Sequence, residues 1–171
     1  QFPYVMKYLA EYNEGIKSSD KVENIIKHFT LSIGFIGLAE ALVALTSTID
    51  SEGNYVKGVH HGESDEAQAL GIEIVRHMHL KCKEFSEKYD LNFGLIATPA
   101  EGLSHVPVYY KCSVNRKAEV EAPYHELTPA GHIFYIEMDG NPLDNLRAVE
   151  KSIDYMLDLN IGYISINHFD N

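Results

Sequence analysis

The sequence predicts an α/β fold with parallel or mixed strands. Two amphipathic helical patterns each precede a strand-like run across a short turn. Residues 65–90 precede FGLIA (93–97), and residues 144–159 precede IGYISIN (161–167). A third strand-like run, HIFYIEM, covers 132–138. Because an intervening helix lets successive strands run in the same direction, this alternation favours α/β construction over an all-helical or all-strand fold.

Composition limits the classes of function. With 171 residues, 45% of them hydrophobic, the chain can bury a core, and one domain is predicted. A formal net charge of −11 argues against nucleic acid or an anionic membrane as partner. The longest apolar window, 31–45, is too short to span a bilayer, and no signal peptide is visible. Two distant cysteines, Cys82 and Cys112, form no CxxC motif, so a cytoplasmic setting is expected.

The first third of the chain predicts two helices and a loop. Residues 18–28 combine polar capping residues with apolar residues at helical spacing, which predicts a short amphipathic helix. Residues 31–45 are apolar on nearly all sides, and two glycines stand near their start. They predict a glycine-rich lead-in followed by a buried helix over about 36–45. The polar, turn-rich segment 48–64 predicts a loop.

The strongest helical pattern begins after Ser64. Ser64 is a favourable N-cap, and Asp65 and Glu66 complement the positive end of the helix dipole. One face carries apolar residues at helical spacing: Ala67, Leu70, Ile74, Met78, Cys82, Phe85 and Tyr89. The helix is predicted to end near Asp90 and to lead directly into the strand at 93–97.

A small-residue turn, TPAEG (98–102), follows that strand, where α/β proteins place ligand-binding loops. Small residues let backbone N–H groups approach a phosphate, and the hydroxyls of Thr98 and Ser104 add donors. The alternative is an ordinary turn whose Pro and Gly only interrupt the chain. No Walker or Rossmann fingerprint supports the phosphate interpretation, and another strand-like run, HVPVYY (105–110), follows at once, so the residues alone favour the ordinary turn.

The histidines and cysteines do not form a recognisable constellation. HHGES (60–64) could contribute to a metal site, but adjacent histidines rarely bind one metal, and a solvated loop ending in a helix cap is favoured. His125 and His132 lie near predicted turns and could serve acid–base chemistry, although bonding to backbone carbonyls is favoured. Cys82 and Cys112, the latter in the strand-like YYKCSV, are interpreted as core residues. No metal site is predicted.

Six segments together resemble one family, the anaerobic (class III) ribonucleoside-triphosphate reductases. They are TLSIGFIGLAEAL (30–42), HHGESDEAQ (60–68), EFSEKYDLNFGLIATPAEGLS (84–104), HVPVYY (105–110), EAPYHELTPAGHIFYIEMDG (121–140) and IGYISINH (161–168). FPYVM (2–6) resembles a segment that the family carries just before its GFIGLAE helix. The resemblance implies part of the ten-stranded α/β barrel of the ribonucleotide reductase and glycyl-radical enzyme superfamily. Residues 1–171 would form a single, partial catalytic-barrel domain from its C-terminal half.

The resemblance also implies a role for the small-residue turn. The family's counterpart of this loop is associated with substrate phosphates at the barrel mouth. The role carries over to Thr98, Pro99, Ala100, Glu101, Gly102, Leu103 and Ser104. The family has a substantial further segment between GLS and HVP, whereas here Ser104 joins His105 directly. A segment is therefore expected to be missing between 104 and 105.

The family's radical chemistry would lie outside this chain. The radical cysteine of the family precedes FPYVM, and its glycyl-radical and four-cysteine zinc regions follow INH, so the catalytic residues here are unknown and the chain alone is expected to be inactive. Family membership implies a glycyl radical installed by an activase that uses S-adenosylmethionine and an iron–sulfur cluster, structural zinc, and ATP or deoxynucleotide effectors. Implied partners are a ribonucleoside triphosphate, the remainder of the reductase chain, the activase and a second subunit. The alternative is a non-catalytic nucleotide-binding remnant or a structural fragment.

Overall fold

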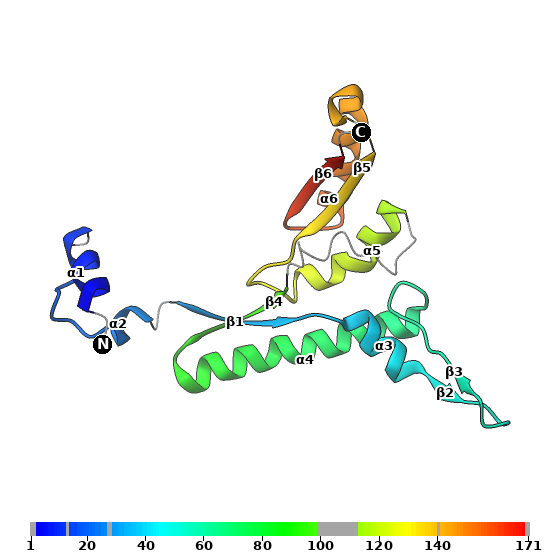
Figure 1. Cartoon of the computed structure of the whole chain (residues 1–171), viewed down its shortest axis with the longest axis horizontal. Coiled ribbons are helices and arrows are strands. Elements are labelled where there is room, and N and C mark those ends of the chain that lie inside the picture. The colour runs from blue at the N-terminus through cyan, green and yellow to red at the C-terminus, as the bar shows by residue number, and fades with distance from the viewer. Residues whose placement is uncertain (1–2, 13, 27–28, 99–112, 140, 170–171) are drawn as a thin grey trace.

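The computed structural model describes residues 3–12, 14–26, 29–98, 113–139 and 141–169. Helices and strands alternate, and the two longer strand pairs are parallel, which confirms the predicted α/β class. In Figure 1, the longest helix runs beside the first of these pairs, and the second pair extends away from it with its own helix. No helix in the described part of the chain is long and apolar enough to cross a membrane.

The N-terminal segment differs from the prediction. Helix α1 (Pro3–Tyr12) was not predicted, and α2 (Glu23–Ile26) is only four residues long, much shorter than the helix predicted over 18–28. Both lie at the far end of strand β1 (Thr30–Phe35), away from the other helices (Figure 1). Of the described residues within the predicted range 18–28, only 23–26 are helical.

The predicted glycine-rich lead-in is the strand β1, so that interpretation was wrong. The run TLSIGF alternates large apolar residues with small or polar ones, which is the two-residue period of a strand. β1 pairs in parallel with β4 (Asn92–Ala97), from Thr30 opposite Asn92 to Phe35 opposite Ala97. Helix α3 (Leu38–Thr46) then follows, close to the predicted helix over 36–45.

The predicted loop at 48–64 contains a small hairpin. β2 (Thr48–Ile49) and β3 (Tyr55–Val56) pair antiparallel and project from the body of the molecule (Figure 1). The Asp50 carboxylate closes the turn by accepting hydrogen bonds from the backbone N–H groups of Glu52, at 2.9 Å, and Asn54, at 2.8 Å. The turn-rich composition predicted the reversal, but not the two short strands that flank it.

Helix α4 (Asp65–Tyr89) confirms the strongest helical prediction. The Ser64 hydroxyl accepts a hydrogen bond from the Ala67 N–H at 3.0 Å, and Asp90 ends the helix in a left-handed conformation with φ of 51°. The buried face differs in part from the predicted one: Ala67 and Cys82 are buried as predicted, but Phe85 and Tyr89 are exposed. Gly71 and Val75 are buried instead, because the helix turns this side toward β4 and α5 (Val114–His125). The short turn at Asp90 brings the chain back along α4 as β4, so helix and strand pack side by side.

Helix α5 (Val114–His125) was not predicted, and the strand-like interpretation of YYKCSV was wrong where the chain is described, because Val114 begins this helix. The Ser113 hydroxyl accepts a hydrogen bond from the Arg116 N–H at 3.2 Å. That cap and the acidic residues spaced along the helix favour helical structure more than the β-branched Val114 disfavours it. Residues 99–112, which include the predicted strand at 105–110 and most of the phosphate turn, lie outside the described residues.

The C-terminal part matches the prediction closely. Strand β5 (Phe134–Asp139) and β6 (Ile164–Phe169) are parallel, with Phe134 opposite Ile164. Between them a short 3₁₀ helix, η2 (Pro142–Asn145), leads into α6 (Leu146–Asp158). An isolated parallel bridge between Ile96 and Gly131 links β4 to the segment that continues into β5.

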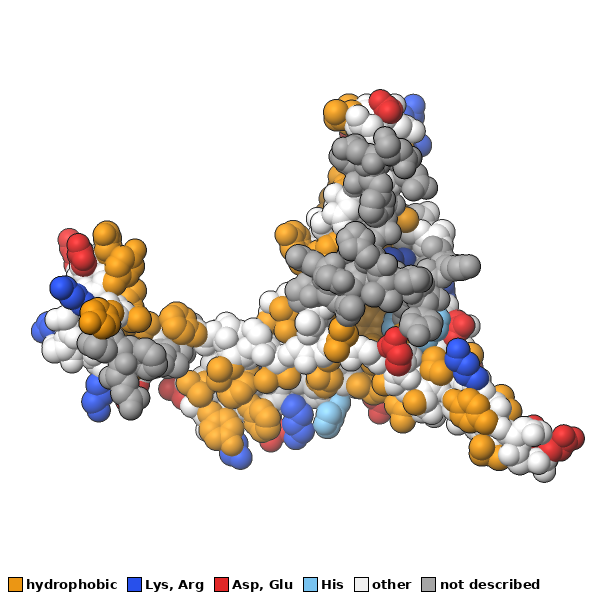
Figure 2. All heavy atoms as spheres, in the orientation of Figure 1, with side chains coloured by type: hydrophobic (Ala, Val, Ile, Leu, Met, Phe, Trp, Pro, Cys, Tyr) orange, Lys and Arg blue, Asp and Glu red, His pale blue; other side chains and the backbone are white. Residues whose placement is uncertain are grey.

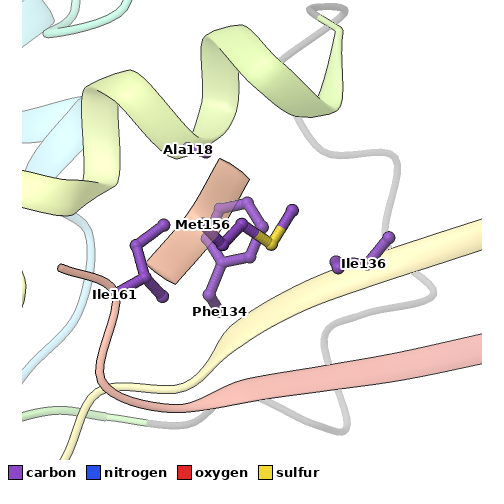
Figure 3. Packing of buried hydrophobic residues seen from close by; sticks show 5 residues of the cluster. All are labelled: Ala118, Phe134, Ile136, Met156 and Ile161. Atoms are coloured by element: carbon purple, nitrogen blue, oxygen red, sulfur yellow. The ribbon is translucent and has the colours of Figure 1, made fainter. Parts of the chain in front are cut away.

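Two apolar clusters hold these layers together. One packs α5 and α6 against β5, and its buried members are Ala118, Phe134, Ile136, Met156 and Ile161 (Figure 3). The other packs α4 and the end of α5 against β4 through Val75, Cys82, Leu95 and Tyr124. The second cluster lies directly behind the carboxyl end of β4 and supports the strand from which the predicted phosphate turn starts.

The Phe134 ring is the largest fully buried side chain in the first cluster, so its removal should destabilise the fold. We expect Phe134→Ala to lower the free energy of unfolding by about 3–5 kcal/mol, because the lost burial adds to the cost of the cavity left behind. Urea unfolding followed by circular dichroism measures this change. Leu143→Ala is the control, since Leu143 is 72% exposed and its loss should change stability by less than about 0.5 kcal/mol. Equal effects of the two variants would contradict this packing.

Candidate functional site

The carboxyl ends of the parallel strands β1 and β4 lie side by side. The Thr98 N–H donates to the Phe35 carbonyl at 3.2 Å, which extends the pairing with β1 by one bond. On the opposite edge, the Ala97 N–H donates to the Gly131 carbonyl at 3.0 Å. Ligands of α/β proteins bind beyond this edge of the sheet, where loops leave the strand ends. The end of β4 is therefore the candidate binding edge of the described structure.

Thr98 is the one residue of the predicted phosphate turn that lies within the described part of the chain; Pro99, Ala100, Glu101, Gly102, Leu103 and Ser104 lie outside it. Thr98 is exposed, and its hydroxyl lies where a side chain at Gly34 would have to go. Gly34 thus allows the Thr98 side chain to sit over β1. Thr98 is therefore an exposed residue directly at the strand end.

The neighbouring strand end leads into helix α3. Gly37 is the N-cap in a left-handed conformation, with φ of 81°, and supplies no side-chain cap to the helix. The first N–H groups of a helix carry partial positive charge, which favours an anion nearby. The Glu40 carboxylate lies in the same first turn of the helix. Its Oε2 would stand 3.7 Å from a Cβ atom added at Gly37, so its negative charge offsets part of the positive charge at this helix end.

A pocket of about 340 Å³ lies on the other side of this helix. Its lining includes two carboxylates, Glu40 and Glu63, together with Lys57 and His60. The backbone N–H of His60 donates to Glu63 Oε2 at 2.9 Å, and the ring Nδ1 of His60 accepts from the backbone N–H of Gly62 at 3.1 Å. Two carboxylates make this pocket an unfavourable binding site for a phosphate, because like charges repel. The end of β4 remains the better candidate for an anion.

The HHGES segment is only partly the solvated loop that its composition favoured. Ser64 caps α4 as predicted, but His61 is buried, with 8% of its surface exposed. Its ring meets the Tyr124 ring edge-on, with centroids 5.7 Å apart. Burial, and then the neighbouring His60, lower the pKa of His61 to about 4, while burial raises the pKa of Tyr124 to about 12. His61 packs against α5 as a neutral ring rather than facing solvent.

His125 and His132 form a stacked pair, which their sequence positions did not reveal. Their ring centroids are 3.9 Å apart and the planes differ by 6°. His132 Nδ1 lies 3.3 Å from the Thr128 hydroxyl, and its Nε2 lies 3.5 Å from Glu121 Oε2. His125 Nε2 is buried and has no hydrogen-bond partner among the described residues. The favoured interpretation, bonding of both rings to backbone carbonyls, was therefore wrong.

The surroundings of this pair restrict where a proton can reside. Burial, and then the adjacent His132, lower the pKa of His125 to about 4, and Glu121 opposes this shift. Glu121 also contacts Lys117, with Oε1 3.8 Å from Nζ. The signal that sequence reasoning missed is the four-residue spacing of Lys117, Glu121 and His125, which places all three on one face of α5. Without that helix in the prediction, the spacing had no structural meaning.

The described residues offer no metal centre. No group of three or more His, Cys, Asp or Glu side chains among them is arranged to hold a metal ion. The two stacked rings lie face to face, so their nitrogens do not converge on one point. Cys82 is buried on α4, and burial raises the pKa of its thiol, which fits the predicted core role. Cys112 lies outside the described residues.

Parallel strands with helical connections, together with a candidate binding edge at the end of β4, define an α/β protein. The model of the family "Anaerobic ribonucleoside-triphosphate reductase" matches residues 1–105 and 103–169. The chain therefore belongs to the anaerobic ribonucleoside-triphosphate reductase family, as its sequence motifs predicted.

Individual relatives agree with this assignment. The anaerobic ribonucleoside-triphosphate reductases of Salmonella typhimurium and Escherichia coli are each 27% identical over 169 residues, which cover 82% of this chain and 22% of those proteins. The enzyme of phage T4 is 24% identical over 190 residues, covering 91% of this chain and 28% of that protein. A solved anaerobic ribonucleotide reductase superposes on 97% of the chain and 28% of its own, with a TM-score of 0.65 and 13% identity. The chain thus spans about a fifth to a quarter of these relatives.

The two buried neutral imidazoles should make the fold sensitive to acid. His61 and His125 have pKa values of about 4 when folded, against 6.5 when unfolded. Between these values the unfolded state binds more protons, so stability is complete above about pH 6.5 and falls as the pH decreases. As the pH falls from about 7 to 5, proton uptake at each histidine in the unfolded state should lower the free energy of unfolding by up to about 2 kcal/mol.

Thermal or urea unfolding across this pH range measures the effect. His61→Phe keeps an aromatic ring against Tyr124 but cannot take up a proton, so about half of the loss should disappear. His77→Gln removes an exposed histidine of α4 and serves as the control, since it should leave the acid sensitivity unchanged. If the unfolding free energy of His61→Phe fell with decreasing pH as steeply as that of the unmodified protein, the neutral, buried state of this ring would be contradicted.

Proposed function

We propose that this chain is part of an anaerobic ribonucleoside-triphosphate reductase, to which it contributes barrel strands and the loop that binds the substrate's phosphates. The observation that carries the proposal is the end of β4. Thr98 emerges there between the Phe35 and Gly131 carbonyls, each of which accepts a hydrogen bond from the last residues of the strand. A loop that starts from such a fixed point can present its backbone N–H groups to an anion in one orientation.

In this proposal the phosphates are bound by the segment from Thr98 to Ser104. Backbone N–H groups and the hydroxyls of Thr98 and Ser104 donate hydrogen bonds to phosphate oxygens, and the small residues allow close approach. The exposed Thr98, whose hydroxyl lies over Gly34, supports the first of these contacts. Glu101 would repel a triphosphate, so its carboxylate bonds to backbone or sugar, or points away.

The proposed reaction of the whole reductase is conversion of ribonucleotides to deoxyribonucleotides by radical chemistry. Abstraction of the sugar hydrogen needs a thiyl radical, and neither cysteine of this chain matches the family residue that supplies it. We therefore assign the radical cysteine, the glycyl radical, the nucleotide effector sites and the contact with the S-adenosylmethionine activase to other parts of the reductase. The two cysteines of this sequence do not fit the family's four-cysteine zinc site, so we assign that site to another part of the reductase as well.

The join between Ser104 and His105 belongs to the same proposal. The family match comes in two stretches, 1–105 and 103–169, which meet at this join. This division supports the view that the family's further segment after GLS is absent here. The residues that usually complete the phosphate loop would then come from a shorter connection, or from elsewhere in the protein.

We further propose that the remainder of the reductase covers the surfaces that this chain leaves open. One edge of β1 has no partner strand among the described residues, and Leu31 and Ile33 are 44% and 42% exposed. Parallel sheets are normally covered on both faces, so these side chains require neighbours. Figure 2 shows exposed hydrophobic side chains along this strand and helix α4. A second subunit and the activase are proposed from family membership.

The alternative is a nucleotide-binding remnant without chemistry. Intact mass of the protein isolated from its natural source distinguishes the two. A mass matching 171 residues would support the remnant, whereas a much larger polypeptide containing this sequence would support the reductase subunit.

Loss of the two loop hydroxyls should weaken nucleotide binding. We expect Thr98→Ala and Ser104→Ala each to raise the Kd for a ribonucleoside triphosphate about tenfold to a hundredfold, as removal of one hydrogen bond to a charged group predicts. Isothermal titration calorimetry measures Kd. Ser51→Ala, in the exposed hairpin turn, is the control and should leave Kd unchanged. Binding that survives both loop substitutions unchanged would contradict the phosphate assignment.

A further inference from the structure

Helix α6 carries a second apolar face, which the described part of the chain leaves open. We propose that this face is the docking site of an amphipathic helix whose apolar stripe is flanked by Lys or Arg. The inference rests on one part of the proposed function, the covering of open surfaces by the remainder of the reductase, and it specifies the chemistry of one covering segment. It uses no residue of the proposed phosphate loop.

One face of α6 is already used for packing. Met156 is fully buried in the first apolar cluster, and Tyr155 and Leu159 pack against that cluster. The Tyr155 hydroxyl also donates to Glu119 Oε1 of α5 at 3.0 Å. These contacts hold α6 in the part of the molecule that extends away from α4 (Figure 1). The position of the helix is therefore fixed without any contact on its second face.

The second face is a row of aliphatic residues along the helix. Its members follow one another at intervals of three, four and four residues: Leu146, Val149, Ile153 and Leu157. This spacing places them on one side of α6, where Leu146 is 62% exposed and Leu157 is 57% exposed. Valine and isoleucine form helices less readily than leucine or alanine, so helix formation does not explain their presence here. Aliphatic residues at this spacing are what one helix presents to another helix.

A shallow groove of about 460 Å³ runs along this row. Its lining combines aliphatic side chains of the row with two carboxylates: Leu146, Val149, Ile153, Glu150 and Asp154. None of the ion pairs between described residues includes Glu150 or Asp154. The basic residues of α6, Arg147 and Lys151, do not line the groove. An occupant that brings positive charge beside its apolar side chains would therefore complement this surface.

Charge distinguishes between the occupants that an apolar helix face can accept. In a symmetric contact between two copies the face would meet itself, so Glu150 and Asp154 would approach the same carboxylates of the second copy. A membrane with anionic lipids would be repelled by these two charges and by the net charge of −11. A helix with Lys or Arg beside its apolar stripe pairs with both carboxylates while its apolar residues fill the groove. The groove therefore favours a basic amphipathic helix.

Two synthetic peptides of about 18 residues, long enough to form a helix, test this inference. Both carry leucine at alternating three- and four-residue spacing, and the positions beside the leucines are Lys in one peptide and Glu in the other. Fluorescence anisotropy measures the Kd of each labelled peptide for the whole 171-residue protein. We expect the lysine peptide to bind about tenfold more tightly, because its charges attract the two carboxylates whereas those of the glutamate peptide are repelled.

Substitutions in the groove identify the site of binding. Leu146→Gln should raise the Kd of the lysine peptide about tenfold, as loss of one leucine contact predicts. Leu80→Gln on α4 is the matched control, since Leu80 is 54% exposed and lies outside the groove, and it should leave this Kd unchanged. The double variant Glu150→Gln, Asp154→Asn should bind the two peptides about equally well. Circular dichroism checks that the variants keep the fold, which the exposure of these side chains predicts.

Equal binding of the two peptides to the unmodified protein, or a Kd that Leu146→Gln leaves unchanged, would overturn the inference. Self-association in sedimentation that Leu146→Gln abolishes would overturn it in favour of a second copy. Binding to phosphatidylcholine–phosphatidylglycerol vesicles that the same substitution abolishes would overturn it in favour of a membrane. Nucleotide binding is measured separately, by calorimetry: its absence, with the lysine peptide bound as expected, would overturn the phosphate loop and leave this docking site standing.

Discussion

The structure depends on β4 being held on both edges. β1 pairs with it in parallel over six residue pairs, and the Ala130–Gly131 segment bonds to its other edge near the carboxyl end. Gly94 shows how close these layers lie, since a Cβ there would stand 2.7 Å from the Ala130 Cβ. The same contacts that join the two halves of the described chain also fix where the chain leaves the sheet at Thr98. Stability and the geometry of the candidate site therefore share one set of backbone hydrogen bonds.

The open surfaces follow from the same arrangement. A parallel sheet needs layers on both faces, and here α4 covers one side of the β1–β4 pair, while β1 remains exposed along nearly its whole length. The uncharged sequence of β1 gives its edge no residue that would discourage pairing. Such an edge is a liability for an isolated domain but is expected of a strand that continues into a larger sheet. In the proposed reductase, neighbouring strands of the larger sheet would pair with this edge.

Sequence patterns were reliable where local and tertiary preferences agreed. The Ser64 cap, helix α4 and the strand after Asp90 were predicted, because each signal lies within a few residues of the element that it specifies. The buried face of α4 was predicted only in part, since burial there depends on which side of the helix β4 and α5 cover. β1 was missed because Gly34 and Gly37 suggested a turn, and only the pairing with β4, about 60 residues later, makes Gly34 a strand residue. Helix α5 was missed because Val114 and the preceding aromatic run suggested a strand. Tertiary contacts decided both cases, as they commonly do for short elements.

The residues of the candidate site were harder to predict from the sequence than the helices and strands. Thr98 could be singled out from its place after a strand, but the histidine pair could not, because its members meet only when α5 and the turn at Gly131 are both formed. Each histidine alone has a simple structural explanation, and the arrangement gives them unequal roles. Burial disfavours a charge on His125, whereas the His132 ring faces the Glu121 carboxylate.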